Sequence, residues 1–256
     1  MHFILQRNQD KTGRSTLDID VRIVRDILDQ TAHIHSYSIL ALEELKEKDL
    51  DKDNIPVGTI DFVQVWLKNY YGISKMEPIE IPVCLQSGYF LGRAYAFVQG
   101  KDLPKTGQFF VKRADALKEL SFSGEIGLLW QAGMIHENGI YQLSELVDFI
   151  SEWRVFVHDW HIENCVNYDG DPLIAPDKDV IRRALIELVK DSNTHYPKAF
   201  TLDVGILSNG RTVLIEMHPW CSVGLYSYLF GNDLPYCYAD GIAWYINENI
   251  PYLYLC

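Results

Sequence analysis

The sequence predicts an α+β protein that carries helices and antiparallel strands in one chain of 256 residues. Two observations lead to this fold class. Apolar residues recur at helical spacing in 19–29 and 176–191, whereas 200–207 and 211–218 alternate apolar and polar side chains on either side of Asn209-Gly210. A composition of 48% hydrophobic and 23% charged residues is that of a globular protein with a buried core.

The first half of the chain is a mixed unit. Residues 3–6 predict a strand and 19–29 a helix, whereas the charged run 43–53 indicates a solvated helix end and loop. The dense apolar run 59–71 fits a buried helix or a buried strand, since it has no clear period. Pro78 and Pro82 bracket a short extended piece.

The second half has more regular signals. Residues 109–112, 144–149 and 153–157 predict strands. Residues 176–191 predict a helix, with a proline at an early position and Asp177 and Asp179 in the first turn. The aromatic-rich run 224–244 indicates a terminal helix and a loop.

The hairpin around Asn209-Gly210 carries the strongest functional signal. A type I′ turn on this pair places Asp203 opposite Glu216, with His218 pointing the same way. Facing carboxylates repel unless a cation lies between them, and two carboxylates with water and phosphate suit Mg²⁺. The alternative is a solvent-facing acidic hairpin. On the opposite face the alternation predicts a set of core residues: Leu202, Val204, Ile206, Val213, Ile215 and Met217.

Basic residues gather in 101–118, within an otherwise acidic chain. Lys112 ends an apolar strand, from which its side chain can reach a cleft, and Lys118 precedes a predicted turn at 122–124. Arg154 lies within a predicted strand and needs an anionic partner, either Glu152 or a ligand. The alternatives are solvated lysines and a structural ion pair for Arg154. Cationic side chains on strands beside a carboxylate pair suit phosphoryl transfer, because this reaction requires neutralisation of the negative charge that develops in it.

Charge and cysteine content exclude several classes. The chain has 23 Lys and Arg against 35 Asp and Glu, a net charge of −12, so we expect neither nucleic acid nor a membrane as partner. No apolar run reaches the roughly 18 residues of a membrane span, and the start of the sequence lacks signal-peptide features. Five cysteines without a CxxC motif favour a reducing, cytoplasmic location.

Three segments in order, 109–124, 141–157 and 201–226, resemble the ATP-grasp fold, and most closely the clade named for a characteristic Arg and two Lys. The resemblance implies two α+β subdomains that clamp a nucleotide in 91–256. It assigns about 105–148 to the smaller lid and 149–256 to the larger, metal-binding subdomain. Residues 1–90 would form a small preceding α/β domain.

The resemblance also implies residue roles. Lys112 and Lys118 would bind nucleotide phosphates, with a weak lid at Ser121, Ser123, Gly124 and Gly127. The adenine would lie along the hinge residues, which are Ser144, Glu145 and Val147. Arg154 would face phosphate or an acyl-phosphate and act in catalysis with Lys118. The metal ligands would be Asp203, Glu216 and His218. His218 stands where the family usually has Asn, and imidazole suits Mn²⁺ better than Mg²⁺.

The implied activity is that of an ATP-dependent carboxylate–amine or carboxylate–thiol ligase. It would form an acyl-phosphate and use an amino acid, a peptide or a protein as substrate, with ATP and Mg²⁺ as cofactors. Two alternatives stay open: a nucleotide-binding regulatory module, motivated by His218, and a phosphotransferase on the same fold. The run 158–163 (HDWHIE) is a metal or acid–base cluster on one interpretation, and a polar strand end and turn on the other.

Overall fold

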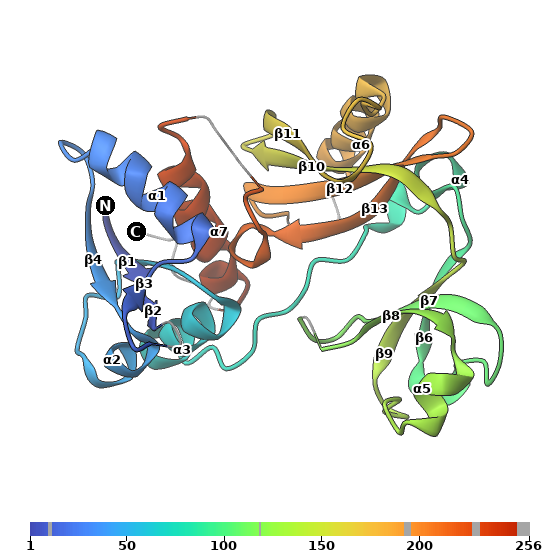
Figure 1. Cartoon of the computed structure of the whole chain (residues 1–256), viewed down its shortest axis with the longest axis horizontal. Coiled ribbons are helices and arrows are strands. Elements are labelled where there is room, and N and C mark those ends of the chain that lie inside the picture. The colour runs from blue at the N-terminus through green and yellow to red at the C-terminus, as the bar shows by residue number, and fades with distance from the viewer. Residues whose placement is uncertain (10–11, 118, 192–195, 227–230, 250–256) are drawn as a thin grey trace.

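The computed structural model describes residues 1–9, 12–117, 119–191, 196–226 and 231–249. Four β-sheets make up this part of the chain: one two-stranded hairpin and three larger sheets, each with helices beside it (Figure 1). No helix among these residues has the length and apolar character that crossing a bilayer requires.

The N-terminal unit is built on a parallel sheet of strand order β4-β1-β5. Its strands are β1 (His2–Gln6), β4 (Ser36–Leu40) and β5 (Ile55–Val57). A short hairpin joins β2 (Asn8–Gln9) to β3 (Ser15–Thr16). The helices are α1 (Ile19–Gln30), α2 (Leu42–Glu47) and α3 (Ile60–Tyr71), and α7 (Leu234–Asn249) returns from the far end of the chain to share their core.

The run 59–71, open to two interpretations from sequence, is the helix α3. The hydroxyl of Thr59 accepts a hydrogen bond from the Phe62 amide at 3.3 Å and so caps the first turn. Gly72 ends the helix with φ of +70°, a conformation that glycine adopts without a Cβ penalty.

The middle unit is a four-stranded antiparallel sheet of order β6-β9-β7-β8. Its strands are β6 (Tyr95–Gln99), β7 (Gln108–Arg113), β8 (Ser121–Glu125) and β9 (Ile140–Ser144), with α5 (Gly127–Gln131) and η2 (Gly100–Asp102) beside them. The turn expected at 122–124 is wrong, because these residues pair with β7 as part of β8. The strand expected over 144–149 is wrong as well, because β9 ends at Ser144 and 145–148 leave the sheet.

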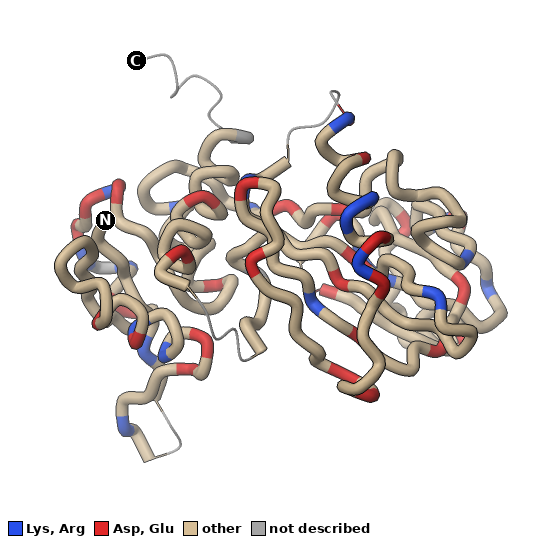
Figure 2. The backbone as a smooth tube through the Cα atoms, turned by 90° about the horizontal axis from the view of Figure 1, so that it is seen from above, with Lys and Arg blue, Asp and Glu red and all other residues tan. Residues whose placement is uncertain are grey.

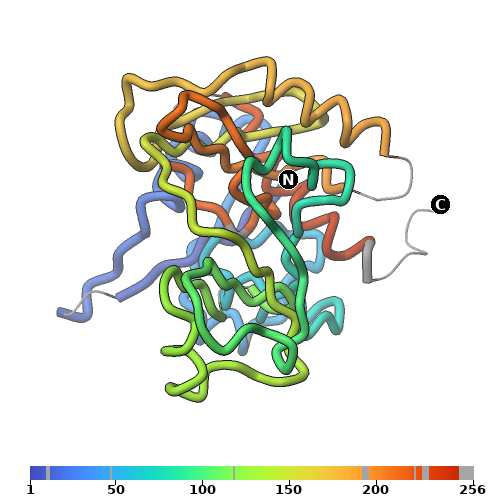
Figure 3. The backbone as a smooth tube through the Cα atoms, turned by 90° about the vertical axis from the view of Figure 1, so that its right-hand side faces the viewer, coloured from blue at the N-terminus to red at the C-terminus, as the bar shows by residue number. Residues whose placement is uncertain are grey.

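The third unit is an antiparallel sheet of order β11-β10-β12-β13. It contains β10 (Phe149–His158), β11 (His161–Gly170), β12 (Ala199–Leu207) and β13 (Thr212–Pro219), with η3 (Trp220–Ser222) after β13. Helix α6 (Lys178–Lys190) covers one face, and η1 (Val83–Leu85) and α4 (Gly88–Leu91) lie beside the sheet. Two connections, 92–94 and 145–148, run between this sheet and the middle one (Figure 3). They are hydrogen-bonded to each other through the Glu145 amide and the Ala94 carbonyl, at 3.1 Å.

A type I′ turn is expected at Asn209-Gly210, but the structure has one in the other hairpin of the third sheet. Asp159 and Trp160 join β10 to β11 with φ of 46° and 68°, the pattern of a type I′ turn. The run 158–163 is therefore a strand end and turn, in which His158 contacts Asp240 of α7 at 2.8 Å. Asn209-Gly210 does not form a type I′ turn: Leu207 pairs with Arg211 around a three-residue loop, and of the two central residues only Gly210 has positive φ.

Candidate functional site

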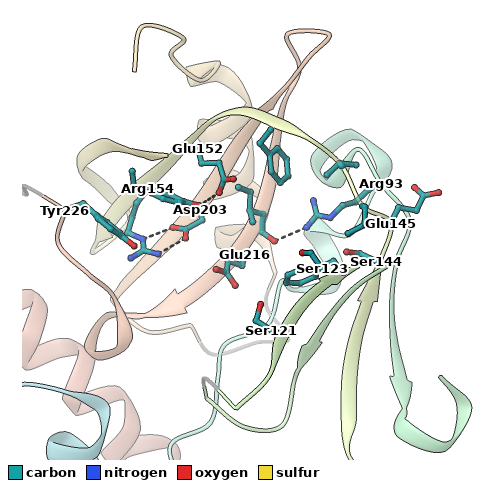
Figure 4. A pocket seen from close by; sticks show the side chains of 16 residues that line it. Arg93, Ser121, Ser123, Ser144, Glu145, Glu152, Arg154, Asp203, Glu216 and Tyr226 are labelled. Carbon is teal, nitrogen blue, oxygen red and sulfur yellow. Dashed lines mark hydrogen bonds and ion pairs between the residues drawn. The ribbon is translucent and has the colours of Figure 1, made fainter. Parts of the chain in front are cut away.

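A row of three charged residues crosses the third sheet. Arg154 on β10 lies opposite Asp203 on β12, and Asp203 lies opposite Glu216 on β13. The expected pairing of Asp203 with Glu216 is therefore confirmed, although the loop that leads to it differs. The row lies at the edge of the space between the third and middle sheets, in the view of Figure 4.

Arg154 and Asp203 form a buried bidentate ion pair. The Nε and Nη2 atoms of Arg154 lie 2.8 and 2.6 Å from the two carboxylate oxygens of Asp203, and the side chains are 7% and 1% exposed. Nη1 also donates to the Gly224 carbonyl at 3.2 Å. The partner of Arg154 is thus Asp203 and not Glu152, and the structural ion pair is the interpretation that the structure supports.

Glu216 is held between two cationic groups. Its Oε2 atom lies 2.7 Å from Lys112 Nζ, and its Oε1 atom lies 2.8 Å from His218 Nε2. Burial alone would raise the pKa of Glu216, but hydrogen bonds and charge from His218 and Lys112 lower it well below its usual range. Burial likewise opposes the charged form of His218, yet its contacts with Asp203 and Glu216 raise its pKa.

The donor set fits a divalent cation. Asp203, Glu216 and His218 each offer one ligand atom, and these atoms lie within 4.8 Å of one another. Both Mg²⁺ and Mn²⁺ bind carboxylate oxygens, but Mn²⁺ accepts an imidazole nitrogen more readily than Mg²⁺ does. The same two carboxylates also contact Arg154, Lys112 and His218.

A cavity of about 390 Å³ lies beside this row, between the third and middle sheets (Figure 4). Its walls include all three expected hinge residues and all three residues of the charged row. The lining residues are Arg93, Phe110, Ser121, Ser123, Ser144, Glu145, Leu146, Val147, Phe149, Glu152, Arg154, Tyr168, Asp203, Ile215, Glu216 and Tyr226. A second cavity of about 240 Å³ shares Ser121, Arg154, Glu216 and Tyr226 with the first, and Lys112 and His218 line it.

The three expected hinge residues, Ser144, Glu145 and Val147, line the cavity. Ser144 is 3% exposed at the end of β9. The carboxylate of Glu145 turns to the connecting segment, where it accepts from the Ala94 amide at 2.8 Å. Within the described part of the chain, the backbone groups of Leu146 and Val147 have no hydrogen-bond partner. They are therefore available to a planar ligand with donors and acceptors on its edge.

Four polar side chains of the cavity are absent from the site that the sequence predicts. Arg93 approaches β13 from the segment before β6. Glu152 lies two residues before Arg154 on β10, and both residues line the cavity. Tyr168 donates to Glu152 Oε2 at 2.7 Å and stacks on Tyr226 at 5.3 Å. The Arg154 guanidinium lies 5.6 and 5.0 Å from these two rings. The sequence points to Glu152 only as a partner for Arg154. Tyr168 lies on β11, which has no recognisable motif, and Tyr226 ends the segment 201–226 without a role assigned to it there.

Of the basic stretch 101–118, Lys112 reaches the acidic hairpin, and Lys118 lies outside the described residues. Lys105 lies over the Trp130 ring, and Arg113 pairs with Asp115 and Glu119. Figure 2 shows Asp and Glu along all parts of the backbone. Among the described residues, the ion pair of Lys112 with Glu216 therefore joins the basic stretch 101–118 to the acidic hairpin.

The fold and the site together define an ATP-grasp protein. The sequence matches the ATP-grasp domain described as family 2 of the clade named for one Arg and two Lys, over residues 90–231, more than half of its length. The chain therefore belongs to this family. No curated protein matches the sequence significantly.

Solved structures agree on the fold. D-cycloserine synthetase DcsG matches with a TM-score of 0.56 and 12% identity, covering 96% of this chain and 100% of that one. D-alanyl-alanine synthetase A from Vibrio cholerae matches with a TM-score of 0.54 and 10% identity, covering 97% and 98%. At these identities the likeness establishes the architecture alone.

Proposed function

We propose that the protein is an ATP-dependent ligase that joins a carboxylate to an amine or thiol through an acyl-phosphate, with an amino acid, a peptide or a protein as substrate. Membership of the ATP-grasp family supports ATP as the nucleotide. Two similarly folded proteins are named as synthetases, which agrees with ligation. The observation that carries the proposal is the cavity whose wall joins the open backbone at 146–147 to the row of Arg154, Asp203 and Glu216.

The cavity suits a nucleotide along its length. Adenine would bind the backbone at 145–147, and Glu152, as a hydrogen-bond acceptor in the cavity wall, suits a ribose hydroxyl. The phosphates would then lie toward Glu216, where Lys112 and Arg93 supply positive charge. Asp203, Glu216 and His218 would hold a divalent cation there. When bound, this ion would neutralise negative charge on the phosphate oxygens.

The ligation needs two compartments that meet at the transferred phosphoryl group. An oxygen of the substrate carboxylate attacks the γ-phosphorus, and the bond from that phosphorus to the β–γ bridging oxygen breaks, releasing ADP. The amine or thiol then attacks the acyl carbon, loses its proton to the departing phosphate, and displaces it. The second cavity shares Arg154 and Glu216 with the first and is suited to the carboxylate and acceptor.

The residues of the chain act here by position and charge. In the proposed reaction Lys112 neutralises phosphate when Glu216 turns to the cation, because its ammonium lines the second cavity and contacts Glu216, which lines both cavities. Arg154 orients Asp203 through its bidentate contact, and this role differs from the direct phosphate contact expected from the resemblance. Lys118 remains a candidate phosphate ligand from the family resemblance.

Product analysis tests this function. The protein is incubated with ATP, Mg²⁺ or Mn²⁺, and mixed pools of amino acids and peptides, and ADP and new condensation products are measured by mass spectrometry. Ligation predicts ADP and phosphate release that depends on both a carboxylate and an amine or thiol. ADP release with an alcohol acceptor alone would identify a phosphotransferase instead.

A specific observation favours a second candidate, a nucleotide-binding regulatory module. Among the three candidate cation ligands, His218 stands where the family usually has Asn, and imidazole is a poorer ligand for Mg²⁺ than an amide oxygen. A module predicts tight ATP binding without ADP formation in any substrate pool. Measuring nucleotide retention and turnover in one sample separates the two functions.

A further inference from the structure

The pairing of Asp203 with Glu216 depends on a β-bulge. The hairpin loop closes with Leu207 opposite Arg211, and regular pairing continues to Val204 opposite Leu214. If that register continued, Asp203 would lie opposite Ile215. Instead Ile215 is an extra residue, and the register shifts by one so that Asp203 lies opposite Glu216.

The bulge also changes which side chains face the cavity. Ile215 lines the cavity together with Glu216, whereas Leu214 lies in the core of the third sheet with Met217. The expected assignment of Ile215 to the core face is therefore wrong. Two neighbouring residues on one face are the signature of the extra residue.

Arg93 holds the carbonyl groups of this bulge. Its Nη1 atom donates to the Leu214 carbonyl at 2.7 Å and its Nη2 atom to the Ile215 carbonyl at 2.9 Å. Nη1 also donates to the Leu91 carbonyl at 3.1 Å. Because β13 is the outer strand of its sheet, no further strand among the described residues lies beside it to pair with these carbonyls.

The backbone next to Arg93 is shaped for this approach. Gly92 has φ of +63°, and a Cβ at this residue would lie 2.7 Å from Val213 Cγ1. A glycine therefore lets the segment before β6 pass close enough to β13 for Arg93 to reach the bulge. Among the described residues no carboxylate forms an ion pair with Arg93, so its contacts are directed to backbone and cavity.

We propose that Arg93 is a positioning residue for the cation site: its guanidinium clamps the bulge at Ile215 and thereby keeps Glu216 opposite Asp203. The inference rests on the proposed function, because it takes these two carboxylates as the pair that holds the cation. A fork with two parallel donors spans the successive carbonyls of Leu214 and Ile215, a contact that an ammonium group cannot reproduce with the same geometry.

Binding of Mn²⁺ alone, measured by electron paramagnetic resonance without nucleotide, tests the clamp. Arg93→Met should lower Mn²⁺ affinity about tenfold, the usual effect of losing a group that supports a metal ligand. If Arg93 acted through its charge alone, removing a cation near the site would raise the affinity. The direction of the change therefore separates the two roles, and unchanged or tighter binding overturns the inference.

Two further variants keep the test decisive if Arg93→Met folds poorly. Gly92→Ala retains the guanidinium but should displace it, and should also weaken Mn²⁺ binding. Deleting Ile215 removes the extra residue, so a regular ladder would place Glu216 opposite Asp203 without a bulge. In this deletion variant, Arg93→Met should no longer reduce the affinity for Mn²⁺. A loss of similar size there contradicts the clamp. Wild-type protein that binds no more Mn²⁺ than Glu216→Gln overturns the proposed cation site, and the inference with it.

Discussion

Asp203 lies opposite Glu216 although the hairpin loop between them would, by itself, pair Asp203 with Ile215. The two carboxylates are not equivalent. Asp203 is 1% exposed and pairs with Arg154, whereas Glu216 is 27% exposed and contacts Lys112 and His218. Substitutions at these two positions should therefore separate the stability of the fold from the chemistry of the site.

Asp203→Asn is expected to destabilise the protein as well as abolish cation-dependent ATP turnover. The asparagine can still accept one hydrogen bond from Arg154 but leaves a buried guanidinium without its counter-charge. We expect a loss of about 2–4 kcal/mol in the free energy of unfolding, measured by urea denaturation. Arg154→Met combined with Asp203→Asn should cost less than the sum of the two single changes, and additive losses would contradict the pairing.

Glu216→Gln is expected to remove turnover and to lower the unfolding midpoint less than Asp203→Asn does. The groups that lose their counter-charge, Lys112 and His218, are 15% and 17% exposed, against 7% for Arg154. Calorimetry with ATP and Mn²⁺ should show that the cation no longer strengthens nucleotide binding. Exposed Glu43→Gln on α2 is a matched control that should leave both quantities as in the wild type.

Gly205→Ala is expected to weaken ATP binding about threefold to tenfold. A Cβ at this position meets the ring of Phe149, which lines the cavity and would have to move into it. Gly210→Ala is the matched control, since nothing lies near its Cβ and its cost is backbone strain at φ of +80°. The control should lower the unfolding temperature and leave ATP affinity unchanged, and the opposite pattern would argue against the cavity as nucleotide site.

His158 should make stability dependent on pH. Its hydrogen bond to Asp240, 2.8 Å away, raises the pKa of His158, and burial opposes this only in part. Because the folded pKa lies above the unfolded value of about 6.5, the stabilisation is complete below that pH and is lost as pH rises through the folded pKa. The wild type should unfold at a higher temperature than His158→Gln. This difference in unfolding temperature should be about 1–3 °C larger at pH 5.5 than at pH 8.5. His161→Gln, at the start of β11, is the control. If the difference between wild type and His158→Gln does not vary with pH, the assignment to His158 is refuted.

Local sequence signals predicted the charged hairpin but not the route by which it forms. The Asn-Gly pair suggested a two-residue loop, and the structure has a three-residue loop together with a bulge at Ile215. These deviations cancel, so Asp203 still faces Glu216. The bulge is not visible in the hairpin sequence because it is held by Arg93, a residue 122 positions away from Ile215.

The elements that sequence analysis missed have weak local patterns. β11 carries mostly polar residues of intermediate burial at the edge of its sheet, so it lacks the alternation that marks a half-buried strand. Helix 19–29 and helix 176–191 were recognisable because each has one apolar stripe, and both are present as α1 and α6. The cavity could not be predicted in full, because Tyr168, Tyr226 and Arg93 meet there through tertiary packing alone.

ADP formation from ATP, measured with and without a mixed pool of carboxylates and amines, tests the central claim most directly. We predict that wild-type protein releases ADP and phosphate in equal amounts when both substrate classes and Mg²⁺ or Mn²⁺ are present. We also predict that Glu216→Gln releases neither. Nucleotide bound tightly by the wild type but never hydrolysed in any pool would contradict the ligase and favour a regulatory module.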